Sequence, residues 1–290
     1  MTLRHAQGQP EPRRGLIDLH LHTTASDGRC SPAELVERAR DAGLTVMAVT
    51  DHDTTAAIAD VRRLAAANGI DAVAGIEITA VEDGFDVHIL GYFLEPGDPG
   101  LQQFLVTQRG IRLERVREIA ARLQTLGMPV DIEPVLAEAR RDPARAVGRP
   151  QVARAMIAAG HVPSVDEAFT SWLSRGRPAF VPRAGASPES VIGIIHAAHG
   201  IASLAHPGRT RIDSRIAALR DAGLDALEAF HSDHDPAERM RYTQLATSLG
   251  AGVTGGSDFH GDPARMIAPG STTLPPEHWT ALCAARAPHA

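Results

Sequence analysis

Histidine and acidic residues recur after apolar, strand-like segments along most of this 290-residue chain. The candidate metal ligands among them are His20, His22, Asp27, His52, Glu77, His88, His206, Asp258 and His260. Imidazole nitrogens and carboxylate oxygens are the donors that Zn²⁺, Mn²⁺ and Fe²⁺ accept in sites that stay open to water and substrate. Because these residues occupy the same place in successive segments, we expect them to converge on one polynuclear metal site that holds two ions or three.

Such a site would carry out hydrolysis at phosphorus. Two divalent ions roughly 3.5–4 Å apart can turn water into a nucleophile and clamp the oxygens of an in-line displacement. Glu77 is the natural bridging ligand, because it is the only carboxylate at the end of its strand. Asp27 and Asp258 would neutralise further positive charge.

The ligands need strands that end at one edge of a sheet. Residues 16–22 alternate, which places His20 and His22 on one face. A helix should begin after Ser31, which forms a capping box with Glu34. Before residue 100, further strands are predicted over 45–50, 71–78 and 86–93, and a second helix over 55–68. After residue 182, helices are predicted over 188–199, 212–222 and 236–249, and strands over 201–205, 224–230 and 251–255. This alternation predicts parallel strands with helices outside them.

The segment from residue 101 to about 175 breaks the alternation and is predicted to be helical. Between Arg109 and Arg154 it carries ten arginines against six acidic residues. We interpret these arginines as a solvated helix face, because the stretch lacks the interleaved aromatic residues of an oligonucleotide-stacking platform. The simplest architecture is one barrel with a helical insertion between its halves. The predicted parts are a disordered tail (1–14), a first barrel part (15–100), a helical insertion (101–183) and a second barrel part (184–290).

In barrels of this kind, chemistry takes place at the C-terminal ends of the strands. His52, Glu77, His206 and Asp258 lie at such ends by the predicted boundaries. His88 lies inside its strand, so it must point into the mouth of the barrel from the strand interior.

Composition excludes several classes of function. All 29 basic residues are arginine, so a Schiff base, pyridoxal phosphate attachment and a P-loop lysine are ruled out. The formal charge of −6 argues against duplex DNA as a partner. No apolar run approaches the roughly 18 residues that span a bilayer, and the polar N-terminus does not resemble a signal peptide. The two cysteines form no disulfide framework, so we expect a cytoplasmic protein with no membrane partner.

Six segments resemble, in order, the motifs of the PHP (polymerase and histidinol phosphatase) superfamily. They are 17–28, 50–53, 75–77, 87–92, 205–208 and 256–260. Within this superfamily the chain most resembles the phosphoesterases that act on nucleoside 3′,5′-bisphosphates, some of which also trim short RNAs from the 5′ end. The segments 147–150 and 176–182 resemble features of that branch.

The resemblance implies an α/β fold, a distorted (β/α)₇ TIM-like barrel with a helical insertion domain, and a trinuclear site usually described with Mn²⁺, Zn²⁺ or Fe²⁺. The implied ligand sets are His20, His22, Glu77 and Asp258 for one ion, Glu77, His88 and His206 for a second, and Asp27, His52 and His260 for a third. The expected catalytic residues are Glu77, Asp258, Arg149 and His234. The resemblance implies that Arg149 and His234 contact substrate; His231 is a further candidate as the neighbour of His234, and Arg177 by position only. The implied activity is attack of a metal-bridged hydroxide on phosphate monoesters of nucleotides, with short 5′-phosphorylated RNA as a further substrate.

Three alternatives stay open at this point. A histidinol-phosphatase-like enzyme would use similar motifs, although the insertion and its Gly-Arg-Pro segment (residues 148–150) count against it. An amidohydrolase barrel shares the His-x-His opening but often needs a carbamylated lysine, which this chain cannot supply. A non-catalytic nucleotide sensor could keep the metal site for structure, although a complete ligand set speaks against that.

Overall fold

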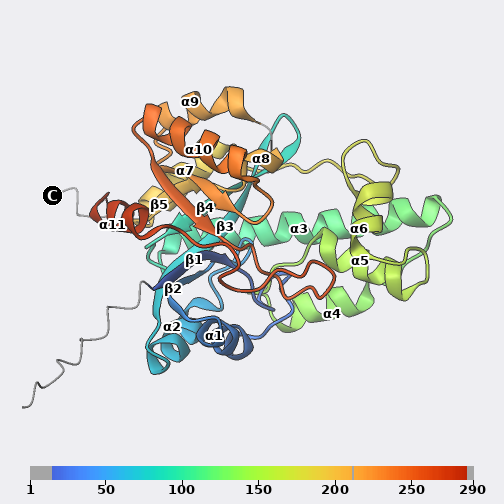
Figure 1. Cartoon of the computed structure of the whole chain (residues 1–290). Helices are drawn as coiled ribbons and strands as arrows, with labels where there is room; N and C mark the ends of the chain where they lie inside the picture. The colour runs from blue at the N-terminus through green and yellow to red at the C-terminus, as the bar shows by residue number, and fades with distance from the viewer. Residues whose placement is uncertain (1–14, 211, 286–290) are drawn as a thin grey trace, which may run out of the picture.

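Seven strands form one sheet in chain order, and the sheet curls into a nearly closed barrel (Figure 1). This computed structural model describes residues 15–210 and 212–285; the tail predicted over 1–14 lies outside them. The strands are β1 (Leu16–Leu21), β2 (Leu44–Val49), β3 (Asp71–Glu82), β4 (Phe85–Tyr92), β5 (Ile201–Leu204), β6 (Ala226–His231) and β7 (Gly252–Gly256). Leu21 bridges to Phe259, just beyond β7, and this contact brings the two edge strands together. The distorted seven-stranded barrel predicted for the chain is confirmed.

The strand directions differ from the prediction at β4. Strands β1 to β3 are parallel to one another, as are β5 to β7, but β4 is antiparallel to both of its neighbours. The cause is a two-residue turn at Asp83 and Gly84, both with positive φ, which pairs Glu82 directly with Phe85. His88 therefore lies near the start of a strand that descends from the mouth of the barrel, opposite Thr79.

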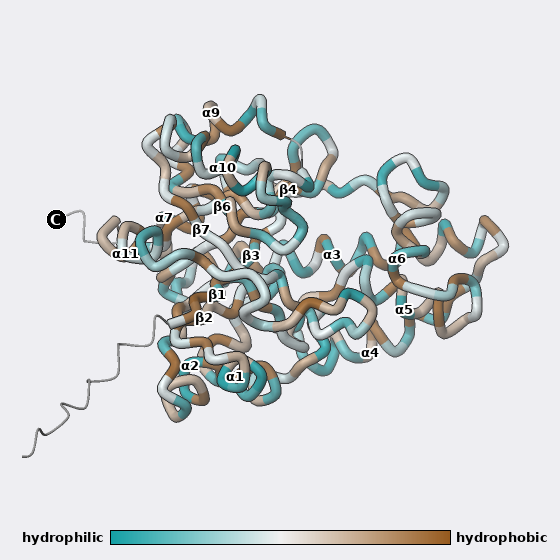
Figure 2. Tube along the Cα trace, in the orientation of Figure 1, coloured by the Kyte–Doolittle hydropathy of each residue, from teal (hydrophilic) through white to brown (hydrophobic). Residues whose placement is uncertain are grey.

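Helices pack around the outside of this barrel. They are α1 (Pro32–Asp41), α2 (Ile58–Ala67), α7 (Pro188–Ala197), the short α8 (Pro207–Thr210), α9 (Asp213–Asp221), α10 (Pro236–Ser248) and α11 (Pro276–Ala285). The predicted capping box of Ser31 and Glu34 is present at the start of α1. The strands carry much of the hydrophobic colour at the centre of Figure 2, as expected for a sheet covered by helices.

A helical lobe projects from one side of the barrel (Figure 1). It comprises α3 (Pro99–Thr125), α4 (Glu133–Arg141), α5 (Arg149–Ala158), α6 (Val165–Ala168) and a π-helical turn, η1 (Phe169–Leu173). The first half of α3 packs on the barrel core through Leu101 and Leu105. Its second half packs on a separate core through Val116, Ile119 and Leu123. One long helix thus joins the two cores, while the predicted boundaries at residues 101 and 183 stay a prediction.

Within the described ranges, no helix combines the length and the apolar character needed to cross a membrane.

Candidate active site

The Glu77 carboxylate lies at the centre of a cluster at the mouth of the barrel. Five imidazole rings surround it, those of His20, His22, His52, His88 and His206. The nearest nitrogen–oxygen distances run from 2.7 Å for His88 to 3.3 Å for His22. The segment after β2 is hydrogen-bonded to strand β3, and this holds His52 beside Glu77. Asp53 N donates to Glu77 O at 3.0 Å, and Glu77 N donates to Asp51 O at 3.2 Å.

Asp258 approaches the same rings from the other edge of the barrel. Its Oδ1 lies 3.3 Å from His20 Nε2, 3.4 Å from His22 Nε2 and 3.5 Å from His260 Nδ1. The backbone amide of Asp258 donates to His20 O at 2.9 Å, which ties this segment to β1. Gly256 permits the close approach, since a Cβ there would lie 2.3 Å from His20 N.

Asp27 completes the cluster beside His260 and His52. Its Oδ1 lies 3.3 Å from His260 Nε2, and its Oδ2 lies 3.8 Å from His52 Nε2. The loop that carries it is braced by the Asp51 carboxylate, which accepts hydrogen bonds from Thr23 and Ser26. The nine residues predicted as ligands therefore meet in one place.

Their donor atoms fall into groups that could each hold an ion. The groups are His20, His22, Glu77 and Asp258; His22, Asp27, His52 and His260; His52, Glu77 and His88; and His20, Glu228 and His231. The first coincides with one implied ligand set, and the second contains another. His206 lies 3.0 Å from Glu77 but belongs to none of these four groups, so the division of ligands among ions stays a proposal.

The hydrogen bonding of the rings shows that these residues fit divalent ions. Among the described residues, several buried imidazole nitrogens lack a hydrogen-bond partner: Nδ1 and Nε2 of His22, Nδ1 of His52, His88 and His206, and Nε2 of His231. A buried polar atom without a partner costs roughly 1–3 kcal/mol, and a metal–nitrogen bond would satisfy it.

The charges of the cluster agree with a cation site. Burial raises the pKa of the Glu77 carboxyl, but the charges of His52, His88 and His20 outweigh it and hold the pKa well below its usual range. Burial lowers the pKa of His22, but the neighbouring Asp258 and Glu77 carboxylates outweigh it and raise the pKa to about 10. In His206, burial dominates and lowers the pKa to about 4. The carboxylates are thus ionised and need positive charge, which protons or metal ions can supply.

The backbone is strained at three positions of the site. Asp53, His206 and Asp258 adopt positive φ values of 50°, 29° and 56°. Residues other than glycine rarely take such values, which cost about 1–3 kcal/mol and concentrate at functional sites. The packing around the cluster therefore holds these residues in place for the arrangement of their side chains.

Glu228 is a site residue that the sequence analysis missed. It is fully buried on β6, where its Oε1 lies 2.8 Å from His20 Nδ1 and its Oε2 accepts the backbone amide of His206 at 2.7 Å. A carboxylate on the second ring nitrogen fixes the tautomer and the orientation of a ligating histidine. The available signal was a lone acid inside the apolar segment 226–230.

We expect Glu228→Gln to weaken binding of divalent ions about 10- to 100-fold, with kcat at saturating ion changed much less, because His20 would lose its orienting carboxylate. Titration of ion-dependent activity measures this directly. Glu95→Gln, at an exposed glutamate, is the control. An unchanged ion affinity in Glu228→Gln would show that the contact with His20 is not needed.

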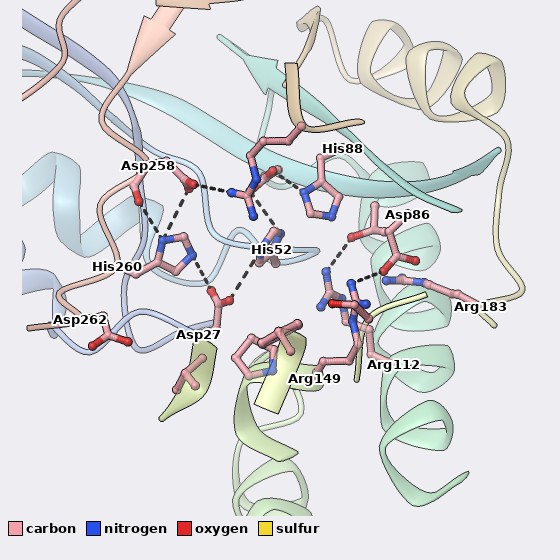
Figure 3. A pocket seen from close by; sticks show the side chains of 18 of the residues that line it. Asp27, His52, Asp86, His88, Arg112, Arg149, Arg183, Asp258, His260 and Asp262 are labelled. Atoms are coloured by element: carbon pink, nitrogen blue, oxygen red, sulfur yellow. Dashed lines mark hydrogen bonds and ion pairs between the residues drawn. The ribbon is translucent and has the colours of Figure 1, made fainter. Parts of the chain in front are cut away.

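A pocket of about 560 Å³ extends from the cluster to the helical lobe. Figure 3 shows Arg112, Arg149 and Arg183 gathered around Asp86 on the side of the pocket away from His260. Asp86 accepts from Arg115 Nη1 at 2.9 Å and from Arg149 Nη2 at 2.8 Å.

Asp53 is shared in the same way by two guanidinium groups, those of Arg112 and Arg183. Burial lowers the pKa of Arg149 and of Arg183 to about 10, so both remain charged at neutral pH. Four guanidinium groups therefore face two carboxylates, which leaves surplus positive charge in the pocket. The interpretation of the arginine-rich stretch as a solvated face is wrong for Arg112 and Arg115, which are largely buried.

The residues predicted to contact substrate lie in different places relative to this pocket. Arg149 lines the pocket, and His231 lies inside the cluster with Nε2 3.3 Å from Asp258 Oδ2. His234 and Arg177 are not among the described residues that line the pocket. Both nitrogens of the His234 ring are used by the backbone, Nδ1 with Ala229 O and Nε2 with Gly208 N, and Arg177 is exposed. Neither residue lines this pocket as it stands, so their role in contacting substrate stays a prediction.

Comparison with known proteins identifies the family. A family model described as the PHP domain matches residues 18–147. The 5′-3′ exoribonuclease Rnm of Escherichia coli (strain K12) is 34% identical over 252 residues, which cover 84% of this chain and 85% of that protein. The chain belongs to the PHP family. A second relative, the 3′,5′-nucleoside bisphosphate phosphatase of Chromobacterium violaceum, is 32% identical over 249 residues, which cover 84% of this chain and 87% of that protein.

A solved structure agrees with the assignment to the PHP family. A protein from Bifidobacterium adolescentis, described as a metal-dependent phosphoesterase, superposes with a TM-score of 0.85 at 32% identity, covering 95% of this chain and 97% of its own. The family predicted from the motifs is confirmed, and the chain is a metal-dependent hydrolase of phosphate esters.

Proposed function

We propose that this PHP protein hydrolyses the phosphate monoester of nucleoside 3′,5′-bisphosphates, and that short 5′-phosphorylated RNA is a further substrate of the same site. The observation that carries the proposal is the surplus of guanidinium groups next to the ligand cluster in one pocket. A substrate with two phosphates can place one at the cluster and the other at the arginines. The relatives named as a bisphosphate phosphatase and an exoribonuclease support the same substrate class.

The proposed metal ligands are the nine clustered residues, with three ions of Mn²⁺, Zn²⁺ or Fe²⁺ per chain and with Glu77 shared between ions. When bound, such ions lower the pKa of water and neutralise charge on the phosphate. Glu77, Asp27 and Asp258 supply the negative charge that retains the ions. We also propose that the protein is cytoplasmic, as the sequence predicts.

Arg149 is the proposed anchor for the second phosphate. Nη2 of Arg149 donates to the Asp86 carboxylate, and Nη1 of Arg149 donates to Leu173 O at 3.4 Å. The guanidinium group is therefore oriented before substrate binds. A guanidinium group suits a phosphate because its parallel N–H donors match two phosphate oxygens. Fixing the distal phosphate would hold the scissile one against the cluster.

Histidinol phosphate fits this pocket less well. It carries one phosphate and an ammonium group, which would face Arg112, Arg115, Arg149 and Arg183. Like charges in a partly buried pocket repel, so the arginines favour a second anion in that place.

The direct test is a substrate panel with protein loaded with Mn²⁺. Release of inorganic phosphate from adenosine 3′,5′-bisphosphate should exceed that from histidinol phosphate, and 5′-phosphorylated oligoribonucleotides should be shortened from the 5′ end. If the bisphosphate and the oligoribonucleotides both stay intact, the proposal is wrong.

Arg149→Ala should lower kcat/KM for adenosine 3′,5′-bisphosphate about 10- to 100-fold, because a charged hydrogen bond contributes roughly 1.5–3 kcal/mol. The effect on adenosine 3′-monophosphate, which lacks the distal phosphate, should stay within about threefold. Asp86 would keep Arg115 as a partner, so the fold should survive.

Arg177→Ala is the matched control, since Arg177 is an exposed arginine of the same lobe. Equal losses on the two substrates in Arg149→Ala would contradict a role in binding the second phosphate.

A further inference from the structure

The pocket is also lined by apolar side chains that the phosphate chemistry does not use. They are Phe85, Val116, Ile119, Val165 and Phe169. Phe85 follows the turn between β3 and β4 with 43% of its surface exposed, whereas Val116 and Ile119 are buried on α3. We call these five residues the apolar wall. Apolar side chains do not bind a phosphate, but they can bind a flat apolar group that is attached to the phosphate.

The two aromatic rings of this wall lie against guanidinium groups. The Arg149 Cζ atom lies 5.4 Å from the centroid of the Phe169 ring, and the Arg175 Cζ atom lies 3.4 Å from that of Phe85. Arg149 therefore contacts both Asp86, at the proposed phosphate site, and Phe169. The sequence stretch 109–154 lacked aromatic residues, but the fold brings Phe169, from η1, to Arg149 of that stretch.

Strand β4 links the arginines to the ligand cluster. Asp86 and His88 are two residues apart and share one face of the strand, so the arginine-binding carboxylate and a ligand of the cluster lie about 7 Å apart along the backbone. Figure 3 shows Asp86 between His88 and the arginines. Phe169 begins a π-helical turn, a rare conformation that often marks functional sites.

We propose that this wall binds the nucleobase of the substrate, with Phe169 as the main stacking residue and Phe85 as the second. The inference rests on the proposed nucleotide substrate and adds a specificity-determining residue to it. Stacking on an aromatic ring tolerates any base, because every base has a π face. The site would therefore select phosphate compounds that carry a base over those that do not, with little preference among bases.

The test compares adenosine 3′,5′-bisphosphate with 1-deoxyribose 3,5-bisphosphate, which has the same phosphates and no base. Phe169→Leu keeps an apolar side chain of similar volume but removes the ring. It should raise KM for the nucleotide about 5- to 100-fold, with kcat within about threefold, and should leave the base-free substrate unchanged. Phe169→Tyr should restore the KM of the unmodified protein.

Phe180→Leu is the matched control. Phe180 also lies under a guanidinium group, that of Arg115 at 5.7 Å, but it is not among the described residues that line the pocket. Equal effects of Phe169→Leu on both substrates, or no effect on either, would overturn the proposal.

A binding experiment separates this inference from the proposed activity. Calorimetry on the unmodified protein compares adenosine 5′-monophosphate with ribose 5-phosphate, and neither ligand needs to be hydrolysed. If no bisphosphate is cleaved but the nucleotide binds more tightly and Phe169→Leu removes the difference, the proposed function fails and the base site stands. If the base adds no affinity, the base site fails whatever the activity.

Discussion

Replacing Glu77 by glutamine should lower kcat by about a thousandfold or more and remove at least one divalent ion per chain, while the barrel stays folded. The reason is the position of the carboxylate among five imidazole rings, all within 3.3 Å of its oxygens. Its pKa is held well below the usual range, by histidine charges that outweigh burial, so the side chain is ionised at any working pH. Glutamine keeps the shape, removes the full negative charge and turns an N–H₂ group toward the rings.

Steady-state kinetics at saturating Mn²⁺ and the metal content of purified protein measure both effects. The control is Glu82→Gln, the same substitution on the same strand, where the carboxylate pairs with Arg215 outside the cluster. A Glu77→Gln protein with full metal content and more than about a tenth of the original turnover would refute a bridging role.

The convergence of the ligands could be predicted because it depends on local pattern alone. His52, His206 and Asp258 each follow the end of an apolar strand, and strand ends meet at one rim when the strands are parallel. His88 was harder, since its strand runs the other way. The information was present in Asp83-Gly84, a pair that favours a two-residue hairpin turn and leaves no room for a crossover helix.

The arginine network could not be predicted in the same way. Asp86 pairs with Arg115 and Arg149, which are 29 and 63 residues away in sequence. Such pairs depend on how α3 and α5 dock against the barrel, and the alternation of polar and apolar residues carries no information about that docking. The partners of His234 are of the same kind, because nothing local predicted that the backbone of Ala229 and Gly208 would use both of its ring nitrogens.

Removing the divalent ions should abolish turnover and lower the melting temperature by roughly 10 °C. One ion bound a thousandfold above its Kd contributes about 4 kcal/mol, and in a protein of this size each kcal/mol corresponds to about 2–4 °C. Melting curves recorded with and without a chelator, followed by return of the ions, measure both the loss and its reversal. A melting temperature unaffected by chelation would show that the cluster does not bind ions in the folded protein.

The size of this stabilisation should increase with pH. Without ions, the positive charge among the carboxylates comes from protonated His20 and His22. Burial lowers the pKa of His22, but the neighbouring Asp258 and Glu77 carboxylates outweigh it and raise the pKa to about 10. A raised folded-state pKa stabilises the protein fully below the unfolded value of roughly 6.5, and that stability is lost as pH rises through the folded-state value. His52 and His206 have pKa values lowered by burial, to about 3 and about 4, and affect stability only below pH 6.5. Protons leave the imidazole rings as pH rises, whereas bound metal ions stay in place. The difference in melting temperature between ion-loaded and ion-free protein should therefore widen from pH 6.5 upward. A difference that narrows over this range would mean that protons and metal ions do not compete for the same imidazole rings.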